Sequence, residues 1–184
     1  MKTLRTLLTA LALLLAPALR ADTLTVTSNA DSGAGTLRQA VLDAAASGDT
    51  IVFAASLSGA TIVLGSEIAL AKSLAIDASS LPAGVTISGN NASRIFSVAG
   101  SQVALQSLTL TGGNGAAANF NHYGGAILNN GGTLMLTRCT LSGNSASGGG
   151  AIENFDNSTL TLTHCTLSAI PPASAARLTT TPAR

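Results

Sequence analysis

Two stretches of this chain repeat each other almost residue for residue. The first reads Gly-Gly-Ala-Ile-Leu-Asn over 124–129 and continues as Leu-Met-Leu-Thr-Arg-Cys-Thr-Leu-Ser over 134–142. The second reads Gly-Gly-Ala-Ile-Glu-Asn over 149–154 and continues as Leu-Thr-Leu-Thr-His-Cys-Thr-Leu-Ser over 160–168. The two are offset by 25 positions in the first part and 26 in the second, so a loop absorbs one residue. Such self-similarity indicates a solenoid, whose copies bury apolar side chains by stacking on one another.

The apolar residues within each copy have a period of two. Leu134 and Leu136 lie two apart, and Cys139 and Leu141 repeat this spacing. Side chains two apart share one face of a strand, whereas a helix has a period of 3.6 residues. Corners rich in Gly and Asn, which tolerate sharp bends, separate three strand-like pieces in each copy. We therefore predict an all-β fold, a parallel β-helix with its coils over residues 61–168.

The repeat also predicts which residues stack on one another. Successive turns of a parallel coil lie about 4.8 Å apart, the spacing of neighbouring strands. Residues at equivalent positions of the two copies should then form vertical pairs along the coil: Ile127 with Ile152, Asn129 with Asn154, and Cys139 with Cys165.

Composition agrees with a solenoid and excludes some functions. Charged residues make up 9% of the chain, where about 25% is usual. Gly, Thr, Ser and Asn fill the outward positions instead. The net charge of +1 includes no basic cluster, and aromatic residues are only 3%. Nucleic-acid binding needs a basic surface or stacking aromatics, so we expect no nucleic-acid partner.

The N-terminus has the pattern of an export signal. Lys2 and Arg5 precede an apolar run over 7–15, and small residues follow, as in a secretory signal peptide. Cleavage after Ala18 and cleavage after Ala21 both fit, and we take 1–21 as the signal peptide. The apolar run is too short to span a bilayer, which takes about 18 residues or more. We expect an exported, secreted or cell-surface chain without a transmembrane segment in its mature form.

Residues 22–60 are predicted to form an N-terminal cap. A helix is expected over 36–47, with Thr36 and Gln39 as a capping box and Gly48 as its stop. This helix would cover the first, otherwise open, layer of the coil, because uncovered strand edges promote aggregation. The alternative is a helix that belongs to an unrelated small domain.

The segments 25–40 and 48–53, together with the Gly-Gly-Ala-Ile and Ser-Gly-Asn-Ser motifs, resemble a known group of proteins. These are bacterial secreted right-handed parallel β-helix proteins with repeats of the polymorphic-outer-membrane-protein type. The likeness covers residues 22 to 168. It implies a right-handed coil, an exported or outer-membrane location, and a role as adhesin, stalk or passenger. We expect this chain to depart from that pattern in having few copies and no C-terminal anchor.

The repeat breaks off after Ser168. The pattern would continue with Gly-Asn-Ser-Ala, but residues 169–184 contain Pro171 and Pro172, which cannot donate ladder hydrogen bonds. One inserted nucleotide in a GC-rich back-translation restores the motif. We therefore predict a truncated or frameshifted N-terminal fragment with a disordered tail, the alternative being a natural low-complexity tail. The last coil would then expose inward-facing side chains and promote self-association: Leu160, Leu162, Cys165 and Leu167.

The two cysteines occupy equivalent inward positions of consecutive coils. In an exported protein a disulfide between Cys139 and Cys165 must be weighed. Stacking brings their Cα atoms within disulfide range, but parallel Cβ vectors aim the sulfurs poorly. We favour a ladder of two small apolar side chains over a disulfide.

The sequence offers no catalytic constellation, cofactor motif or metal site. No carboxylate lies between Asp77 and Glu153, whereas glycosidases need two facing acids. Glu153 and Asp156 fall in one corner, where we expect a solvated loop. His122 and His164 have no acid or nucleophile at a motif spacing. We therefore predict that the chain is not an enzyme.

The best candidate for a contact surface is the insert over 112–125. It carries Phe120, His122 and Tyr123, and loops that leave a rigid scaffold often carry binding. The alternative is an ordinary disordered excursion. Surface glycans and host or cell-surface proteins are the expected partners.

Two function classes remain open. The first is a non-catalytic structural or adhesive repeat protein. The second is the remnant of a polysaccharide lyase or glycosidase of β-helix fold, for which fold analogy is the only support.

Overall fold

Three parallel sheets wind the chain into a β-helix. The computed structural model describes residues 21–45, 47–117, 122–168 and 179–180. Sheet A consists of β1 (Thr23–Val26), β2 (Ser47–Phe53), β5 (Ser73–Asp77), β8 (Gln102–Gln106), β11 (Thr133–Thr137) and β14 (Thr159–Thr163). Sheet B consists of β3 (Thr61–Val63), β6 (Val85–Ser88), β9 (Leu108–Thr111), β12 (Thr140–Ser142) and β15 (Thr166–Ser168). Sheet C consists of β4 (Ile68–Leu70), β7 (Phe96–Ala99), β10 (Ile127–Asn130), β13 (Ile152–Phe155) and β16 (Thr179–Thr180).

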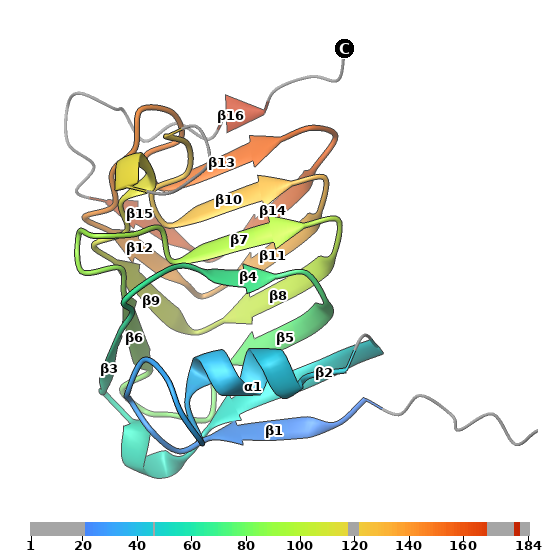
Figure 1. The fold of residues 1–184 in the computed structure, drawn as a ribbon, viewed down its shortest axis with the longest axis vertical. Helices are drawn as coiled ribbons and strands as arrows, with labels where there is room; N and C mark the ends of the chain where they lie inside the picture. The colour runs from blue at the N-terminus through green and yellow to red at the C-terminus, as the bar shows by residue number, and fades with distance from the viewer. Residues whose placement is uncertain (1–20, 46, 118–121, 169–178, 181–184) are drawn as a thin grey trace, which may run out of the picture.

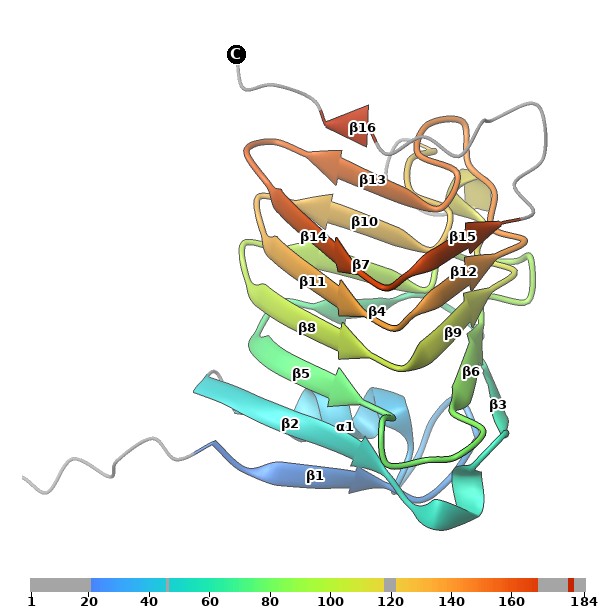
Figure 2. The same cartoon turned by 180° about the vertical axis from the view of Figure 1, so that it is seen from behind.

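From β2 onward the chain visits sheets A, B and C in the same order in five successive turns. In Figure 1 the strands of sheet C run from left to right across the front, and sheets A and B return behind them as the chain climbs. The view from behind shows the same winding (Figure 2). A coil that climbs in this sense is right-handed. The predicted right-handed parallel β-helix is confirmed.

The strand pairs of the described residues are all parallel and, apart from one register shift between Ser47 and Asp49 in β2, in register, so that side chains form columns inside the coil. The predicted pairs Ile127 with Ile152 and Asn129 with Asn154 are direct register partners. In sheet A one inward column runs from Ile51 to the last turn through Ile76, Leu105, Leu136 and Leu162. Each fully buried Leu or Ile contributes roughly 1.5–3 kcal/mol.

The Gly-Gly-Ala-Ile motif marks the point where the chain turns into sheet C. Gly124 and Gly149 have φ angles of +62° and +55°, which favour glycine. At the next position a Cβ on Gly125 would collide with the carbonyl oxygen of Gly150 in the turn above. The two glycines therefore serve different needs, one conformational and one steric.

Helix α1 (Leu37–Asp43) covers the N-terminal end of the coil beside β1 and β2 (Figure 1). Two short 3₁₀ helices, η1 (Ala55–Leu57) and η2 (Gly115–Ala117), lie in connections. The Thr36 side chain accepts a hydrogen bond from the Gln39 backbone N–H at 3.2 Å, as the capping box requires. The Gln39 side chain, however, donates to Asp43 at 2.7 Å. Only half of the predicted capping box is therefore formed.

The helix is shorter than the predicted 36–47. Lys72 donates from its ammonium to the Leu42 carbonyl at 2.8 Å and also reaches the carbonyls of Val41 and Ala44. The N–H of Ala45 donates to the Asp49 carboxylate at 2.6 Å. These side chains end the helix before Gly48, which instead lies within β2 at a shift in register.

Two predicted segments fall largely outside the described residues. Of the signal peptide over 1–21, the structure describes Ala21, which is exposed. Of the tail over 169–184 it describes Thr179 and Thr180, which form β16 and pair in parallel with β13. These two residues therefore continue sheet C by one strand, and the rest of the predicted tail lies outside the described residues.

Candidate functional site

The predicted contact surface lies where the chain passes from sheet B to sheet C. We call residues 112–125 the corner loop; the structure describes 112–117 and 122–125 of it, and Phe120 falls outside the described residues. In Figure 1 this loop and the connection between β12 and β13 lie together at one edge of the coil. The structure places His122 and Tyr123 at this edge, and both are exposed.

The corner loop is joined to the turn above it by backbone hydrogen bonds. Asn114 and Ser145 form an isolated parallel bridge, and Tyr123 and Gly148 form a second one. In addition, the Gly113 N–H donates to the buried side-chain oxygen of Asn144 at 2.8 Å. These contacts lie at both ends of the loop. Its described parts are therefore fixed to the coil.

Arg94 joins the same loop to the turns below it. Its side chain is fully buried and donates to the carbonyl oxygen of Tyr123 from Nη2 at 2.7 Å and to that of Gly124 from Nε at 3.0 Å. From Nη1 it donates to Glu67 at 2.7 Å, in an ion pair across one turn. A planar guanidinium suits several fixed acceptors at once, which an ammonium does not. Arg94 therefore sets where Tyr123 lies.

The roles of Arg94 and Glu67 were not predicted from the sequence. A usable signal was present, because Glu67 precedes Arg94 by close to one repeat length, which places the two residues one above the other. The same spacing separates Asp22 from Asp49, which are also in contact. In a solenoid, two residues of opposite charge that lie one repeat apart are expected to be in contact. The same holds for a carboxylate and a hydrogen-bond donor at that spacing.

Glu153 also lies at this corner, which corrects the prediction of a solvated acidic loop. Its side chain is 3% exposed. A Cβ on Gly149 would lie 2.6 Å from its Oε2 atom, so the carboxylate packs directly against this glycine. Asp156, in contrast, follows the far end of β13 and is exposed. The two carboxylates therefore have different environments.

The exposed part of the corner offers an aromatic ring and neutral polar groups. Tyr123 is 40% exposed, and a Cβ on Gly148 would collide with its ring, so glycine is required beneath it. His122 Nδ1 lies 3.1 Å from the Ala116 carbonyl oxygen. Asn90 and Asn91 are exposed in the turn below, with φ angles of +54° and +55°. Rings and amides of this kind suit neutral polar ligands.

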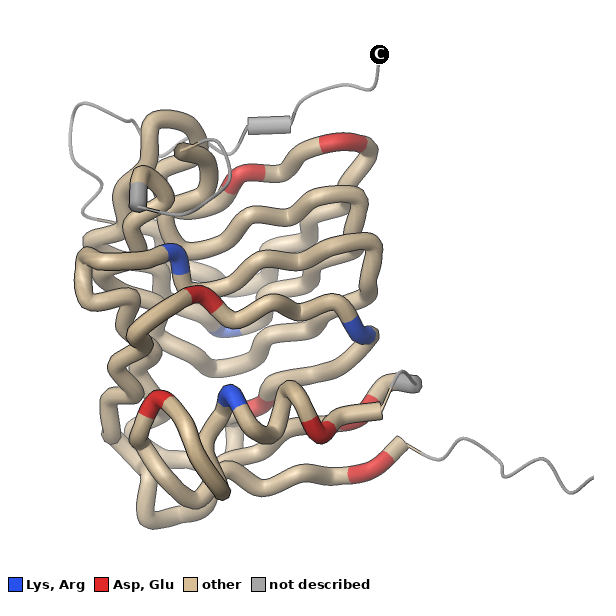
Figure 3. Tube along the Cα trace, viewed as in Figure 1, with Lys and Arg blue, Asp and Glu red and all other residues tan. Residues whose placement is uncertain are grey.

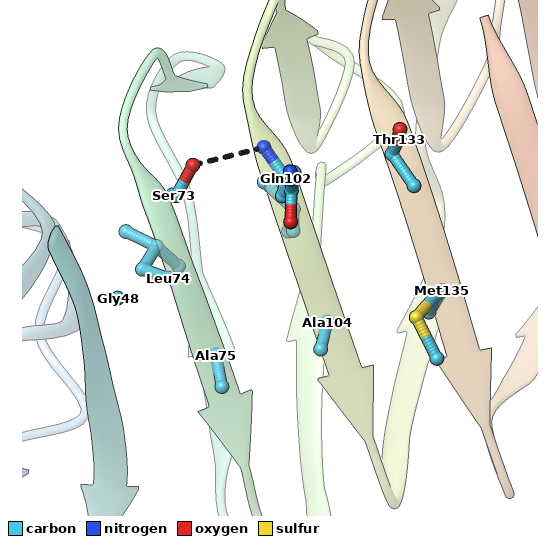
Figure 4. Close-up of a pocket in the computed structure, with 9 residues that line it drawn as sticks. Gly48, Ser73, Leu74, Ala75, Gln102, Ala104, Thr133 and Met135 are labelled. Atoms are coloured by element: carbon cyan, nitrogen blue, oxygen red, sulfur yellow. Dashed lines mark hydrogen bonds between the residues drawn. The ribbon is translucent and has the colours of Figure 1, made fainter. Parts of the chain in front are cut away.

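A second candidate surface lies on the outer face of sheet A. It is a shallow depression of about 230 Å³, drawn in Figure 4. Ala75, Ala104 and Met135 are register partners across three strands and form its floor. Ser73 Oγ accepts a hydrogen bond from the Gln102 backbone N–H at 3.2 Å on its rim. The lining residues carry no titratable side chain, so this depression offers contact area rather than chemistry.

Charged residues are sparse over the described chain. Figure 3 shows several of them around the N-terminal cap and the others scattered singly along the coils. Within the described ranges no three His, Cys, Asp or Glu side chains gather as a metal site would need. Over the same part of the chain, no helix has the length and apolar character needed to cross a membrane.

Cys139 and Cys165 are free thiols in the structure. Cys139 is 1% exposed, and burial raises the pKa of its thiol to about 11. Its Sγ atom points to the Leu105 carbonyl oxygen at 3.5 Å, and that of Cys165 points to Leu136 O at 3.4 Å. Each sulfur therefore faces the turn below it, which is the arrangement of a ladder.

Comparison with known proteins gives no family for this chain: no protein-family model matches it, and no curated protein sequence does either. What the structure establishes is a parallel β-solenoid of about five turns with one short helix near its N-terminus.

Proposed function

We propose that the chain is exported and acts at a cell surface or outside the cell as a non-catalytic, adhesive β-solenoid. The signal-peptide pattern over 1–21 supports export. The resemblance of the repeats to polymorphic-outer-membrane-protein-type repeats supports a surface role. The outward side chains are mostly neutral and hydroxylated, which suits contact with neutral polymers.

The corner loop is the contact surface in this proposal, and neutral glycans are its ligand. The observation that carries it is the position of Tyr123, a ring that is 40% exposed on a backbone held by buried Arg94. A fixed aromatic ring loses little conformational freedom when a ligand stacks on it. The neighbouring Asn side chains and backbone amides supply hydrogen bonds for hydroxyl groups.

Self-association at the C-terminal end of the coil is a second part of the proposal. The last turn carries inward-facing side chains that are only partly buried: Leu160, Leu162, Cys165 and Leu167. In the described residues β14 and β15 are the edge strands of sheets A and B. Edges with an apolar face readily pair with another chain.

A binding experiment with two aromatic variants tests the proposed contact surface. The exported chain is applied to arrays of neutral glycans and to the surface of intact cells. Tyr123→Ala should abolish binding, and Tyr123→Phe should retain it because the ring is kept. Phe155→Ala serves as the matched control, since Phe155 is also 40% exposed but lies at the far end of β13.

Two results would contradict this proposal. The first is glycan binding by Tyr123→Ala at the level of the parent chain. The second is an equal loss in Tyr123→Ala and Phe155→Ala, which would indicate a general apolar effect rather than a site at the corner. Retention of the chain inside the cell would contradict the proposed export.

A further inference from the structure

Asp49 is a carboxylate in a column of the core. Its register partner in the next turn is Leu74, and the column continues through Val103, Leu134 and Leu160. Asp49 itself is 2% exposed. A carboxylate at such a position is costly unless hydrogen bonds and positive charge compensate for lost water.

The carboxylate accepts two backbone hydrogen bonds. Its Oδ1 atom accepts from the Asp22 nitrogen at 2.8 Å, and Oδ2 accepts from the Ala45 nitrogen at 2.6 Å. These bonds, helped by the charge of Lys72, hold the pKa of Asp49 below its ordinary value although burial acts in the opposite direction. The Lys72 ammonium itself donates to carbonyl groups at the end of α1. Within the described part of the chain, no Lys or Arg side chain forms a salt bridge with this carboxylate.

Asp22 is the first residue of the described chain that pairs with β2. Its nitrogen donates to Asp49, and its carbonyl oxygen accepts from Thr50 N at 2.9 Å in β2. Ala21 precedes it and is exposed. The bond between Ala21 and Asp22 therefore joins an accessible small residue, of the kind signal peptidases accept before the cleaved bond, to the first anchored residue of the sheet.

We propose that a signal peptidase cleaves the chain between Ala21 and Asp22 and that Asp49 is the binding site for the α-ammonium group this creates. The inference rests on the export in the proposed function. Water supplies the hydroxyl group to the Ala21 carbonyl carbon as the C–N bond breaks. The leaving peptide keeps a carboxylate, and the Asp22 nitrogen takes up protons and becomes an ammonium.

Processing thus replaces an uncharged amide donor to Asp49 with an ammonium group, and the hydrogen bond becomes an ion pair at the first turn of the coil. Cleavage after Ala18 would instead leave residues 19–21 ahead of the sheet and place the charge away from Asp49. The ion pair between Asp22 and Asp49 would stabilise the pairing of β1 with β2, because Asp22 leads directly into β1 (Thr23–Val26). Removal of the signal peptide would then stabilise the N-terminal cap.

The processing step is tested by exporting the full chain from a bacterial host and determining its N-terminus by intact mass and sequencing. A product that begins at Asp22 supports the proposal. A product that begins at residue 19 keeps export and overturns the processing site. An unprocessed chain contradicts export and the processing site together.

The ion pair is tested separately with purified chains 22–184 and 19–184, each with Asp49 or with Asp49→Asn. The urea midpoint of 22–184 should exceed that of 19–184, and the difference should vanish in the Asp49→Asn background. Equal midpoints with Asp49 present would overturn the binding site. If Asp49→Asn fails to fold, NMR titration of the Asp22 amine in 22–184 decides: a pKa above the ordinary value of about 8 supports the pair, and an ordinary value overturns it.

Discussion

Arg94 is the residue on which the geometry of the corner depends most. A fully buried guanidinium is stable only where acceptors surround it, and the carbonyls of Tyr123 and Gly124 and the Glu67 carboxylate provide them. Those acceptors belong to a turn above and a turn below Arg94. One side chain therefore connects three consecutive turns at the edge where we place the contact surface.

Replacing Arg94 should lower the free energy of unfolding more than breaking the other Arg–carboxylate pair in the described part of the chain. We expect Arg94→Met to lower the free energy of unfolding by about 3 kcal/mol, because it leaves buried carbonyls without a donor. Arg38 pairs with Asp31 at the same 2.7 Å and also donates to the carbonyls of Ser66 and Glu67, but its side chain is 21% exposed and neither of those two residues is buried. Arg38→Met should therefore cost about 1 kcal/mol or less.

Urea unfolding measures both Arg variants, and limited proteolysis reports on the corner loop. Arg94→Met should be cleaved there faster than the parent chain, whereas Arg38→Met should not. Similar stabilities and similar cleavage for the two variants would show that Arg94 does not position the loop.

The two cysteines should differ in reactivity and should not form a disulfide. The intact mass of the purified chain is expected to be the same with and without reductant. Cys139 is buried and its thiol has a pKa of about 11, so that it stays protonated at pH 8. Cys165 is only half-buried and should react first with iodoacetamide. A mass two hydrogens lower before reduction would establish the disulfide instead.

At the scale of elements, the bends between sheets A and B repeat one backbone conformation. Ser107, Arg138 and His164 occupy this bend in three successive turns with φ angles of +56°, +54° and +53°. One turn earlier the connection is longer, at residues 78–84, and Gly84, which directly precedes β6, has a φ angle of +61°. Glycine adopts this region without the steric cost that a side chain carries.

Arg138→Gly should therefore stabilise the chain. Relief of the left-handed conformation is expected to raise the free energy of unfolding by about 1 kcal/mol. Thr137→Gly, one residue earlier in the extended strand β11, should lower it by about 1 kcal/mol. Urea unfolding of the two neighbouring glycine variants makes the comparison, and a loss of stability in both would refute the argument from φ.

The elements differ in how far the sequence alone predicts them. The strands follow from alternation, and residues such as Leu134 and Leu136 are buried as predicted. The end of α1 could not be predicted from the local sequence, because it depends on tertiary contacts that Lys72 and Asp49 make at the end of the helix. The burial of Glu153 was missed for a similar reason, since the pattern within a strand does not show which loop covers its outer face.

Within the candidate site, the sequence indicated the loop but not what holds it. An insert with His122 and Tyr123 is visible as an interruption of the repeat. The support from Arg94 is not visible locally, because its acceptors are about one turn away in either direction. Only the repeat length, applied to charged residues, connects these positions.

At the scale of the whole molecule, the two ends of the coil are unlike. At the N-terminal end α1 contributes buried Leu37 and Val41, and Val26 of β1 is fully buried. At the C-terminal end the inward Leu residues of the last turn remain partly exposed. Apolar surface at one end, next to strand edges that have no partner among the described residues, favours association of chains.

A charge on the inner face of the last strand of sheet A should prevent this association. The parent chain is expected to show concentration-dependent oligomers in sedimentation velocity, and Leu162→Lys should be a monomer. Thr161→Lys, on the outward face of the same strand, adds the same charge and should still associate. A parent chain that is monomeric at every concentration would contradict the proposal.

Two kinds of connection between strands, those from sheet C to sheet A and those from sheet B to sheet C, contrast in length. Those from sheet C to sheet A are short throughout, at residues 71–72, 100–101, 131–132 and 156–158. Those from sheet B to sheet C vary from residues 64–67 to residues 112–126 without any change in the register of the strands that follow. The seam between sheets B and C can therefore be lengthened and diversified without disturbing the sheets, much as an antibody varies its hypervariable segments on a constant framework. A foreign peptide grafted into the seam would be displayed at a fixed height along the rod.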